Sequence, residues 1–227
     1  MKNPITSTII ILLLAGSSVP AATHYVSPGS TNPTPPYTSW ATAATNIQDA
    51  LNVAAARDAV LVTNGVYPGG VSVTNALALL SVNGPEFTTI NAHAAFGVNC
   101  VSLAEGASLT GFTLTNGYGY DPLGGGVACA SPNAFLTNCI IVGNLGGGAL
   151  GGTLYDCTLA SNNMGGASHS TLYNCTLRGN FGPATGAAAY CTLYNCMLTG
   201  SDSTAAFQTT LYNCTLTQNS GFNGGRR

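Results

Sequence analysis

The stretch Thr171-Leu-Tyr-Asn-Cys-Thr-Leu177 decides the fold, because the chain repeats it. Further copies occupy residues 153–159, 192–198 and 210–216, and a more divergent copy occupies residues 134–140. When the copies are aligned, their cysteines form one column with successive intervals of 18, 18, 21 and 18 residues: Cys139, Cys157, Cys175, Cys196 and Cys214. Repetition at a nearly fixed period predicts a solenoid of stacked, similar coils.

The spacing of apolar residues within one copy predicts a coil with a corner. A strand shows the same face at every second residue, as Cys175 and Leu177 do, but Leu172 lies three residues before Cys175. The chain must therefore bend between two short strands, and Asn174 lies at the bend. Asparagine tolerates the left-handed backbone conformation that such a corner needs. The same column holds Asn or Asp in every copy, which predicts an asparagine ladder: Asn138, Asp156, Asn174, Asn195 and Asn213.

Two repeat architectures fit this pattern, and the parallel β-helix fits better. The glycine-rich stretches 145–149, 165–167 and 186–188 are too short for helices, and we interpret them as a third strand. A leucine-rich repeat also matches the run from Leu172 to Asn180. Its usual period is about 20 to 29 residues, however, and its return segment is not glycine. The sequence thus predicts an all-β, right-handed, single-stranded parallel β-helix.

The N-terminal 58 residues differ from the repeats. Residues 1–21 have the parts of a secretory signal: Lys2, an apolar run at 9–15 and small residues at 19–21. The apolar run is too short to span a bilayer. We therefore expect a secreted or cell-surface protein whose mature chain begins near Ala22.

Residues 22–58 are predicted to form an N-terminal cap that contains one amphipathic helix. Ile47, Ala50, Leu51 and Ala54 fall on one helical face, and Thr45 with Gln48 matches a capping box. A helix before the first coil can cover the open apolar end of a solenoid.

Residues 59–227 are predicted to be stacked coils of one domain. Strands are expected at 59–63, 71–73, 78–82, 89–90, 98–103 and 109–114 before the regular copies begin. No closing helix or strand is expected after the last copy. End-to-end self-association through the uncapped last coil is therefore a further prediction, and a longer parent chain is the alternative.

Several segments resemble a known superfamily. Tyr25-Val-Ser-Pro-Gly29, the segment at Trp40, and residues 47–51 and 59–67 are similar to the start of secreted β-helix proteins of the pectin-lyase-like superfamily. The repeated copies resemble the later rungs of that fold. The Gly-Gly-Ala stretches near Asn144 and Asn162 are also similar to repeats of polymorphic outer-membrane proteins. The superfamily includes lyases, hydrolases, epimerases, adhesins and surface passengers, so the resemblance implies a fold and not one function.

Charged residues are scarce. They make up 5% of the chain, and the formal net charge is -2, so strong attraction to nucleic acid or anionic membranes is not expected. The resemblance implies that a lyase would need a basic residue and cation sites beside sugar carboxylates. Asp121, Asp156 and Asp202 fall in different coils, and Asp156 is explained as the Asn substitute of the corner column. The least implausible catalytic set is His169, Arg178 and Asp121, and we predict no catalytic residue, metal ligand or cofactor.

The cysteines allow two interpretations. Five in one inward column can act as small buried hydrophobes with free thiols, which we favour, or some can form disulfides. Cys100, Cys129 and Cys191 lie outside the column and are the better candidates for a bridge. No spacing of Cys and His is typical of zinc.

The tyrosines of the copies should form an outward row of Tyr155, Tyr173, Tyr194 and Tyr212. Stacked aromatic side chains stabilise a sheet face, and they also offer apolar surface with hydroxyl groups to a sugar or a protein. The sequence predicts a non-catalytic surface module that binds polysaccharide or an extracellular protein. The alternative is a carbohydrate-active enzyme, a lyase or hydrolase.

Overall fold

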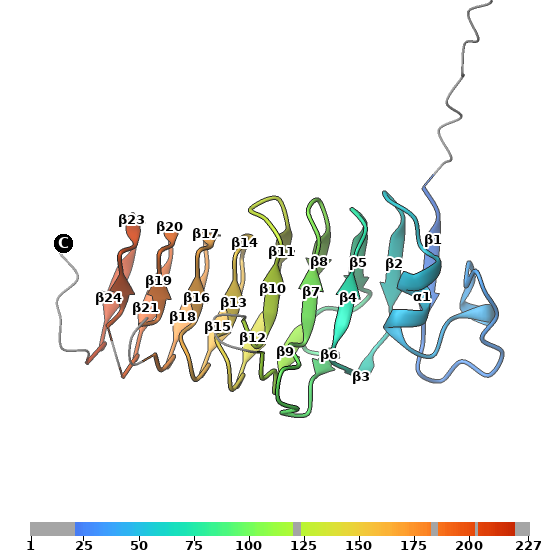
Figure 1. The fold of residues 1–227 in the computed structure, drawn as a ribbon, viewed down its shortest axis with the longest axis horizontal. Helices are drawn as coiled ribbons and strands as arrows, with labels where there is room; N and C mark the ends of the chain where they lie inside the picture. Colours follow the sequence, from blue (N-terminus) through green and yellow to red (C-terminus); the bar gives the residue numbers. More distant parts are fainter. Residues whose placement is uncertain (1–20, 120–123, 183–185, 203, 221–227) are drawn as a thin grey trace, which may run out of the picture.

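The computed structural model describes residues 21–119, 124–182, 186–202 and 204–220. The chain winds through three parallel sheets, and each full rung adds one strand to each sheet (Figure 1). The result is a right-handed parallel β-helix, with the N-terminal region at one end of the stack and the last repeat at the other. This confirms the predicted fold.

The strands of each sheet follow one another along the stack. Sheet A contains β1 Thr23–Val26, β2 Ala59–Val62, β5 Ala78–Ser81, β8 Ser108–Thr110, β11 Phe135–Thr137, β14 Thr153–Tyr155, β17 Thr171–Tyr173, β20 Thr192–Tyr194 and β23 Thr210–Tyr212. Sheet B contains β3 Gly65–Pro68, β6 Thr88–Asn91, β9 Thr113–Thr115, β12 Ile140–Val142, β15 Thr158–Ala160, β18 Thr176–Arg178, β21 Met197–Thr199 and β24 Thr215–Thr217. Sheet C contains β4 Val71–Val73, β7 Val101–Leu103, β10 Val127–Cys129, β13 Ala149–Leu150, β16 Ala167–Ser168, β19 Ala188–Ala189 and β22 Ala206–Phe207.

The repeated copies stack in register. Leu172 of β17 pairs with Leu193 of β20, although the interval between these copies is 21 residues and not 18. The three additional residues lie between Asn180 and Ala188, where sheet B turns into sheet C. Leu172, Cys175 and Leu177 are buried in the core, as the apolar spacing predicts.

In the repeated copies, sheets A and B meet at a corner formed by one left-handed residue per rung. Every member of the predicted column has a positive φ: Asn138 50°, Asp156 54°, Asn174 54°, Asn195 54° and Asn213 51°. The bend between Leu172 and Cys175 is therefore confirmed. We call this line of residues the A/B corner.

The third strand is shifted from its predicted position. The glycine-rich stretches reach sheet C only at their last residue, because the strands begin at Ala149, Ala167 and Ala188. The glycines instead form the turn between sheets B and C, where rungs approach closely. A Cβ on Gly148 would lie 2.4 Å from the carbonyl oxygen of Gly166, so the glycine is required there.

A second asparagine ladder, inside the core, was not predicted. Asn144, Asn162 and Asn180 are fully buried at the turn between sheets B and C. The amide of Asn144 donates to Asn162 Oδ1 at 2.9 Å, and that of Asn162 donates to Asn180 Oδ1 at 3.0 Å. Each side chain also donates to a backbone carbonyl of the preceding rung. The ladder satisfies polar groups that this turn would otherwise bury without partners.

The irregular first rungs contain two differences from prediction. Residues 109–114 form two strands and not one, because Gly111, with φ of 79°, and the buried Phe112 separate β8 from β9. Of the stretch 98–103, only Val101–Leu103 is a strand. The strand predicted at 71–73 is confirmed.

The predicted capping helix forms at the N-terminal end as α1, Ile47–Val53, after a 3-10 turn at Trp40–Thr42. Ile47, Ala50 and Leu51 face the core. The predicted capping box is wrong by one residue, because Asn46 is the N-cap and accepts a hydrogen bond from the Asp49 backbone N–H at 2.8 Å. In the described ranges, no helix has the length and apolar character needed to cross a membrane.

Gln48 instead joins α1 to the edge of sheet C. Its Oε1 accepts from the Ser72 backbone N–H at 2.9 Å, and its Nε2 donates to the Ser72 carbonyl at 3.3 Å. The side chain thus forms with β4, the first strand of that sheet, the backbone hydrogen bonds that a neighbouring strand would form. The opposite end differs: among the described residues no strand pairs with the downstream edge of β22, β23 or β24.

Candidate functional site

The predicted tyrosine row is present on the outer face of sheet A. Successive rings of Tyr155, Tyr173, Tyr194 and Tyr212 have centroids 5.0, 4.8 and 4.7 Å apart and planes within 9° of parallel. Neighbouring rings therefore cover each other's faces, and the row presents ring edges and hydroxyl groups outward.

Beside the tyrosine row, the A/B corner carries a row of exposed amides. Asn174 Nδ2 donates to Asp156 Oδ1 at 3.2 Å, Asn195 donates to Asn174 at 3.4 Å, and Asn213 donates to Asn195 at 2.7 Å. One donor and one acceptor of an amide are used in such a chain, and an amide has two of each. We call Asp156, Asn174, Asn195 and Asn213 the corner row, and it retains hydrogen-bonding capacity toward solvent.

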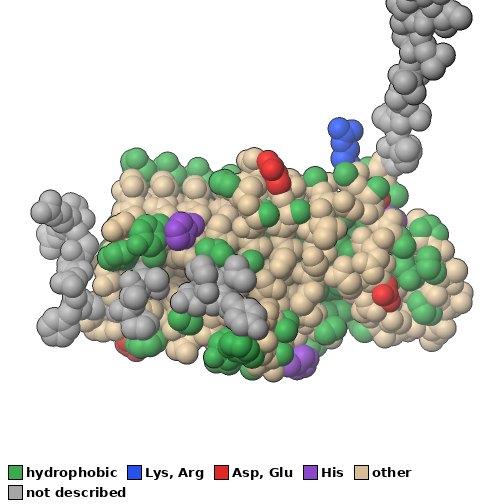
Figure 2. Space-filling view, in the orientation of Figure 1, with side chains coloured by type: hydrophobic (Ala, Val, Ile, Leu, Met, Phe, Trp, Pro, Cys, Tyr) green, Lys and Arg blue, Asp and Glu red, His purple; other side chains and the backbone are tan. Residues whose placement is uncertain are grey.

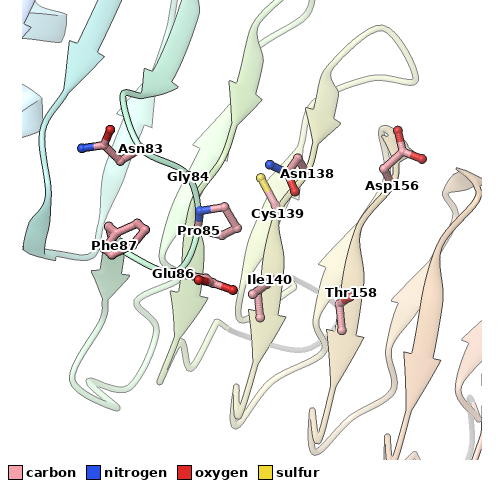
Figure 3. A pocket seen from close by; sticks show the side chains of 10 residues that line it. All are labelled: Asn83, Gly84, Pro85, Glu86, Phe87, Asn138, Cys139, Ile140, Asp156 and Thr158. Atoms are coloured by element: carbon pink, nitrogen blue, oxygen red, sulfur yellow. The ribbon is translucent and has the colours of Figure 1, made fainter.

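A groove of about 360 Å³ lies at the upstream end of the corner row (Figure 3). The loop between β5 and β6 forms one wall with residues 83–87, and the corner residues Asn138 and Asp156 lie on the other side. Figure 3 shows Pro85 and Glu86 on the side of the loop that faces β12. Glu86 and Asp156 are both exposed, and these two carboxylates, 70 residues apart in the sequence, line the corner groove from opposite sides. Sequence analysis did not predict the groove.

Charged side chains are sparse on the surface. Figure 2 shows a face made mostly of backbone and uncharged side chains, with isolated charged residues. In the described part of the chain the cationic side chains are Arg57, beside the cap, and Arg178, at the end of β18. Neither lines the corner groove. Within the described ranges, the tyrosine row, the corner row and the groove thus contain no cationic side chain.

The predicted catalytic set is not assembled by the described residues. His169 lies in the turn from sheet C to sheet A, where its ring stacks on Tyr190 at 4.9 Å, and Tyr190 in turn meets Phe207 edge-on. Arg178 lies on sheet B before the next corner, so one sheet separates the two residues along the rung. Asp121 lies outside the described residues.

A buried pair near the N-terminus is structural. His24 Nε2 lies 3.1 Å from Asp58 Oδ2, and His24 Nδ1 lies 2.6 Å from the carbonyl oxygen of Pro36. Burial raises the pKa of Asp58, but hydrogen bonds from the backbone of Ala22 and Ala55 and from His24 outweigh it, and the net pKa is below its ordinary value. The pair joins β1 to the start of β2 and faces no cavity described above.

The structure holds all eight cysteines as free thiols, so the bridge considered for Cys100, Cys129 and Cys191 is not formed. Burial raises the pKa of Cys100 and of Cys129 to about 12 and that of Cys191 to about 11. Such thiols stay protonated at neutral pH and are poor nucleophiles. Across the described ranges, no three His, Cys, Asp or Glu side chains gather in a way that could hold a metal ion.

The fold is shared with solved structures of low sequence identity. A pectin methylesterase in complex with a hexasaccharide matches with a TM-score of 0.54 and 13% identity, over 79% of this chain and 66% of that one. Escherichia coli YbhC matches with 0.62 and 11%, over 95% and 75% of the two chains. Pectate lyase Pel9A matches with 0.57 and 13%, over 78% and 53%.

These likenesses show the fold alone, the right-handed parallel β-helix of pectin-lyase-like proteins. The chain spans less than two thirds of the length of the methylesterase and about half of the lyase. No family model matches the sequence, and no curated protein is similar to it.

Proposed function

We propose that the chain is a non-catalytic module, secreted or held at the cell surface, that binds polysaccharide along the A/B corner. One observation carries this proposal: each rung from β14 onward adds one tyrosine and one corner Asn or Asp in register with the last. The rings recur every 4.7 to 5.0 Å. A polymer of repeating units can meet such a repeating set of hydroxyls and amides in successive identical contacts.

The chemistry of this surface supports a sugar ligand. Hydroxyl and amide groups both donate and accept hydrogen bonds, as sugar hydroxyls do. Tyrosine also supplies apolar surface at low cost in conformational entropy. Solved structures of the same fold include a pectin methylesterase that holds a hexasaccharide. An extracellular protein as partner is the weaker candidate, because the groups that repeat along the surface are the hydroxyls and amides that match sugar hydroxyls.

A carbohydrate-active enzyme is the second candidate, and one observation favours it. The corner groove is lined by both Glu86 and Asp156, and glycoside hydrolases act through a pair of carboxylates. Neither residue is buried, whereas the general acid of such an enzyme usually lies in an apolar pocket. The binding function is therefore the better supported of the two.

The test is binding of soluble polysaccharides, followed by titration calorimetry, with the double variant Tyr173→Ala, Tyr194→Ala. We expect loss of about tenfold or more in affinity, because two central contacts of the row are removed. Circular dichroism should show an intact fold. The matched control is Tyr190→Ala, which removes an aromatic ring at the other edge of sheet A and should leave binding unchanged.

Three results would contradict the proposal. Unchanged polysaccharide binding by the double variant would exclude the tyrosine row. Release of shortened or unsaturated sugars by the wild-type protein, abolished by Glu86→Gln, would favour the enzyme. A mass that retains residues 1–21 in the exported protein would contradict the signal peptide.

Sedimentation at rising concentration tests the predicted end-to-end self-association.

A further inference from the structure

We infer that the polysaccharide bound along the A/B corner is a neutral one, and that Glu86 and Asp156 exclude anionic chains from the corner groove. This inference rests on the proposed function and adds the class of ligand. It adds a role for Glu86, to which the binding proposal assigns no part, and a second role for Asp156, the first member of the corner row.

The groove lies on the path that a ligand bound along the corner row follows when it extends upstream. The groove is lined by Asp156, which is also the first member of the corner row and accepts a hydrogen bond from Asn174. A chain that lies along the row and extends upstream therefore enters the groove. There it passes between β12 and the loop of residues 83–87, which carries Glu86 (Figure 3).

Among the described residues, no cationic side chain offsets the two negative charges. Arg57 and Arg178 are the described cationic side chains, and neither lines the groove. A sugar carboxylate placed in it would face Glu86 and Asp156 and lose part of its hydration. Unpaired like charges at an interface disfavour binding strongly. A chain of uronic acids is therefore a poor ligand for this groove.

The same groove suits neutral sugars. Ionised carboxylates accept strong hydrogen bonds from hydroxyl groups. The amides of Asn83 and Asn138 and the hydroxyl of Thr158 also line the cavity and provide donors and acceptors without charge. A neutral polysaccharide finds hydrogen-bonding partners at each of these positions.

Asp156 can be substituted without disturbing the corner of the fold, which makes the inference testable. Its column holds asparagine in the four other copies, with φ between 50° and 54°. Asp156→Asn therefore keeps the corner conformation and an Oδ1 acceptor for Asn174 while removing one charge. Selection against a wrong ligand by a repulsive group is a common route to specificity.

The experiment compares neutral oligosaccharides of β-1,4-linked glucose, xylose and galactose with oligogalacturonate of similar length, by titration calorimetry at low salt with EDTA present. The proteins are the wild type and the double variant Glu86→Gln, Asp156→Asn. We expect the wild type to bind at least one neutral oligosaccharide about tenfold or more tightly than oligogalacturonate. In the double variant, oligogalacturonate should gain several-fold in affinity, and neutral oligosaccharides should gain none, because the carboxylates that accept hydrogen bonds from their hydroxyl groups become amides.

The outcomes separate this inference from the proposed function. Preference of the wild type for oligogalacturonate, with dependence on Tyr173 and Tyr194, would overturn the inference and leave polysaccharide binding standing. An unchanged preference in the double variant would overturn it as well. Oligogalacturonate binding that appears only when calcium replaces EDTA would show that the carboxylates recruit a cation, which also contradicts it. Binding of neither class would overturn both proposals.

Discussion

At the scale of single residues, asparagine does two different things in this chain. At the A/B corner it supplies the left-handed conformation that the bend needs, and its side chain is exposed. At the turn between sheets B and C, Asn144, Asn162 and Asn180 are buried, and their amides bond along the stack. The buried ladder is interrupted at Ser201, whose hydroxyl is buried and has no hydrogen-bond partner, and Asn219 takes the ladder position on the following rung.

We predict that Ser201→Asn stabilises the protein by about 1 kcal/mol, because it replaces an unpartnered hydroxyl with an amide in line with Asn180. The backbone N–H of Ser201 already bonds to Asn219 Oδ1 at 3.0 Å, so the following rung is arranged for a ladder. Thermal unfolding followed by circular dichroism measures the change. The control Ser201→Ala removes the hydroxyl without adding the amide, and equal stability of the two variants would contradict the ladder explanation.

We also predict that burial, and not disulfide bonding, protects the cysteines from alkylation. Cys100, whose pKa burial raises to about 12, and Cys175 should resist iodoacetamide at pH 8 in the native protein. After unfolding without a reducing agent, all eight cysteines should be alkylated, as counted by mass spectrometry. Fewer than eight labels would reveal a disulfide. Cys214, half-exposed on the last described rung, should react first and serves as the internal control.

At the scale of elements, the N-terminal cap depends on polar contacts between segments distant in the sequence. Gln48 joins α1 to β4, and Asp58 joins the start of β2 to β1 and to its neighbouring turn. These contacts replace the backbone bonding that further rungs supply elsewhere in the stack. Stability of the cap should therefore depend on pH through Asp58.

The lowered pKa of Asp58 fixes the sign of that dependence. A carboxyl whose pKa is lower in the folded state stabilises that state fully at pH values above its ordinary pKa of about 4. This contribution is lost as the pH falls through the pKa of the folded state. We predict that chemical denaturation shows falling stability below about pH 4. Asp58→Asn should be less stable at pH 7 and should lose much of this acid dependence. Parallel pH profiles for both proteins would contradict the assignment.

The positions of strands were predictable where apolar and polar side chains alternate within one copy. They were less predictable where contacts between rungs determine the backbone. The parity of Leu172, Cys175 and Leu177 gave two of the three sheets and the corner between them. The third strand was displaced because glycines near Ala149 are required by close contact between rungs, which no single copy reveals. The inner Asn column recurs at the same interval as the cysteines, but asparagine in a glycine-rich turn is usually exposed. The corner groove depends on a loop 70 residues away from Asp156, and sequence spacing contains no signal for it.

At the scale of the whole molecule, stability comes from stacking. Fixing the backbone of a residue costs about 1 to 2 kcal/mol, and one buried leucine returns about 1.5 to 3, so no single rung can fold alone. Each leucine of the core contacts its counterparts on neighbouring rungs through paired strands. Loss of one such residue should therefore be felt beyond its own rung.

We predict that Leu172→Ala lowers the free energy of unfolding by about 2 to 5 kcal/mol in one cooperative transition. Leu172 is fully buried between the leucines of the adjacent rungs. Tyrosine fluorescence, which reports the row on sheet A, and the signal of Trp40 in the cap should shift to the same denaturant midpoint. Separate midpoints for the two signals would show that the repeats unfold locally. Thr176→Ala, on the outer face of the same rung, is the control and should change stability little.

The register across the 21-residue interval has a consequence for how such a protein evolves. Because the additional residues are taken up outside the strands, the copies on either side remain equivalent. A crossover between two copies of the gene, displaced by one repeat, would add or delete a whole rung and leave both ends of the protein unchanged. Each rung gained this way would lengthen the tyrosine and amide rows by one step. Natural selection could then adjust the reach of the surface in units of one repeat, without inventing a new contact.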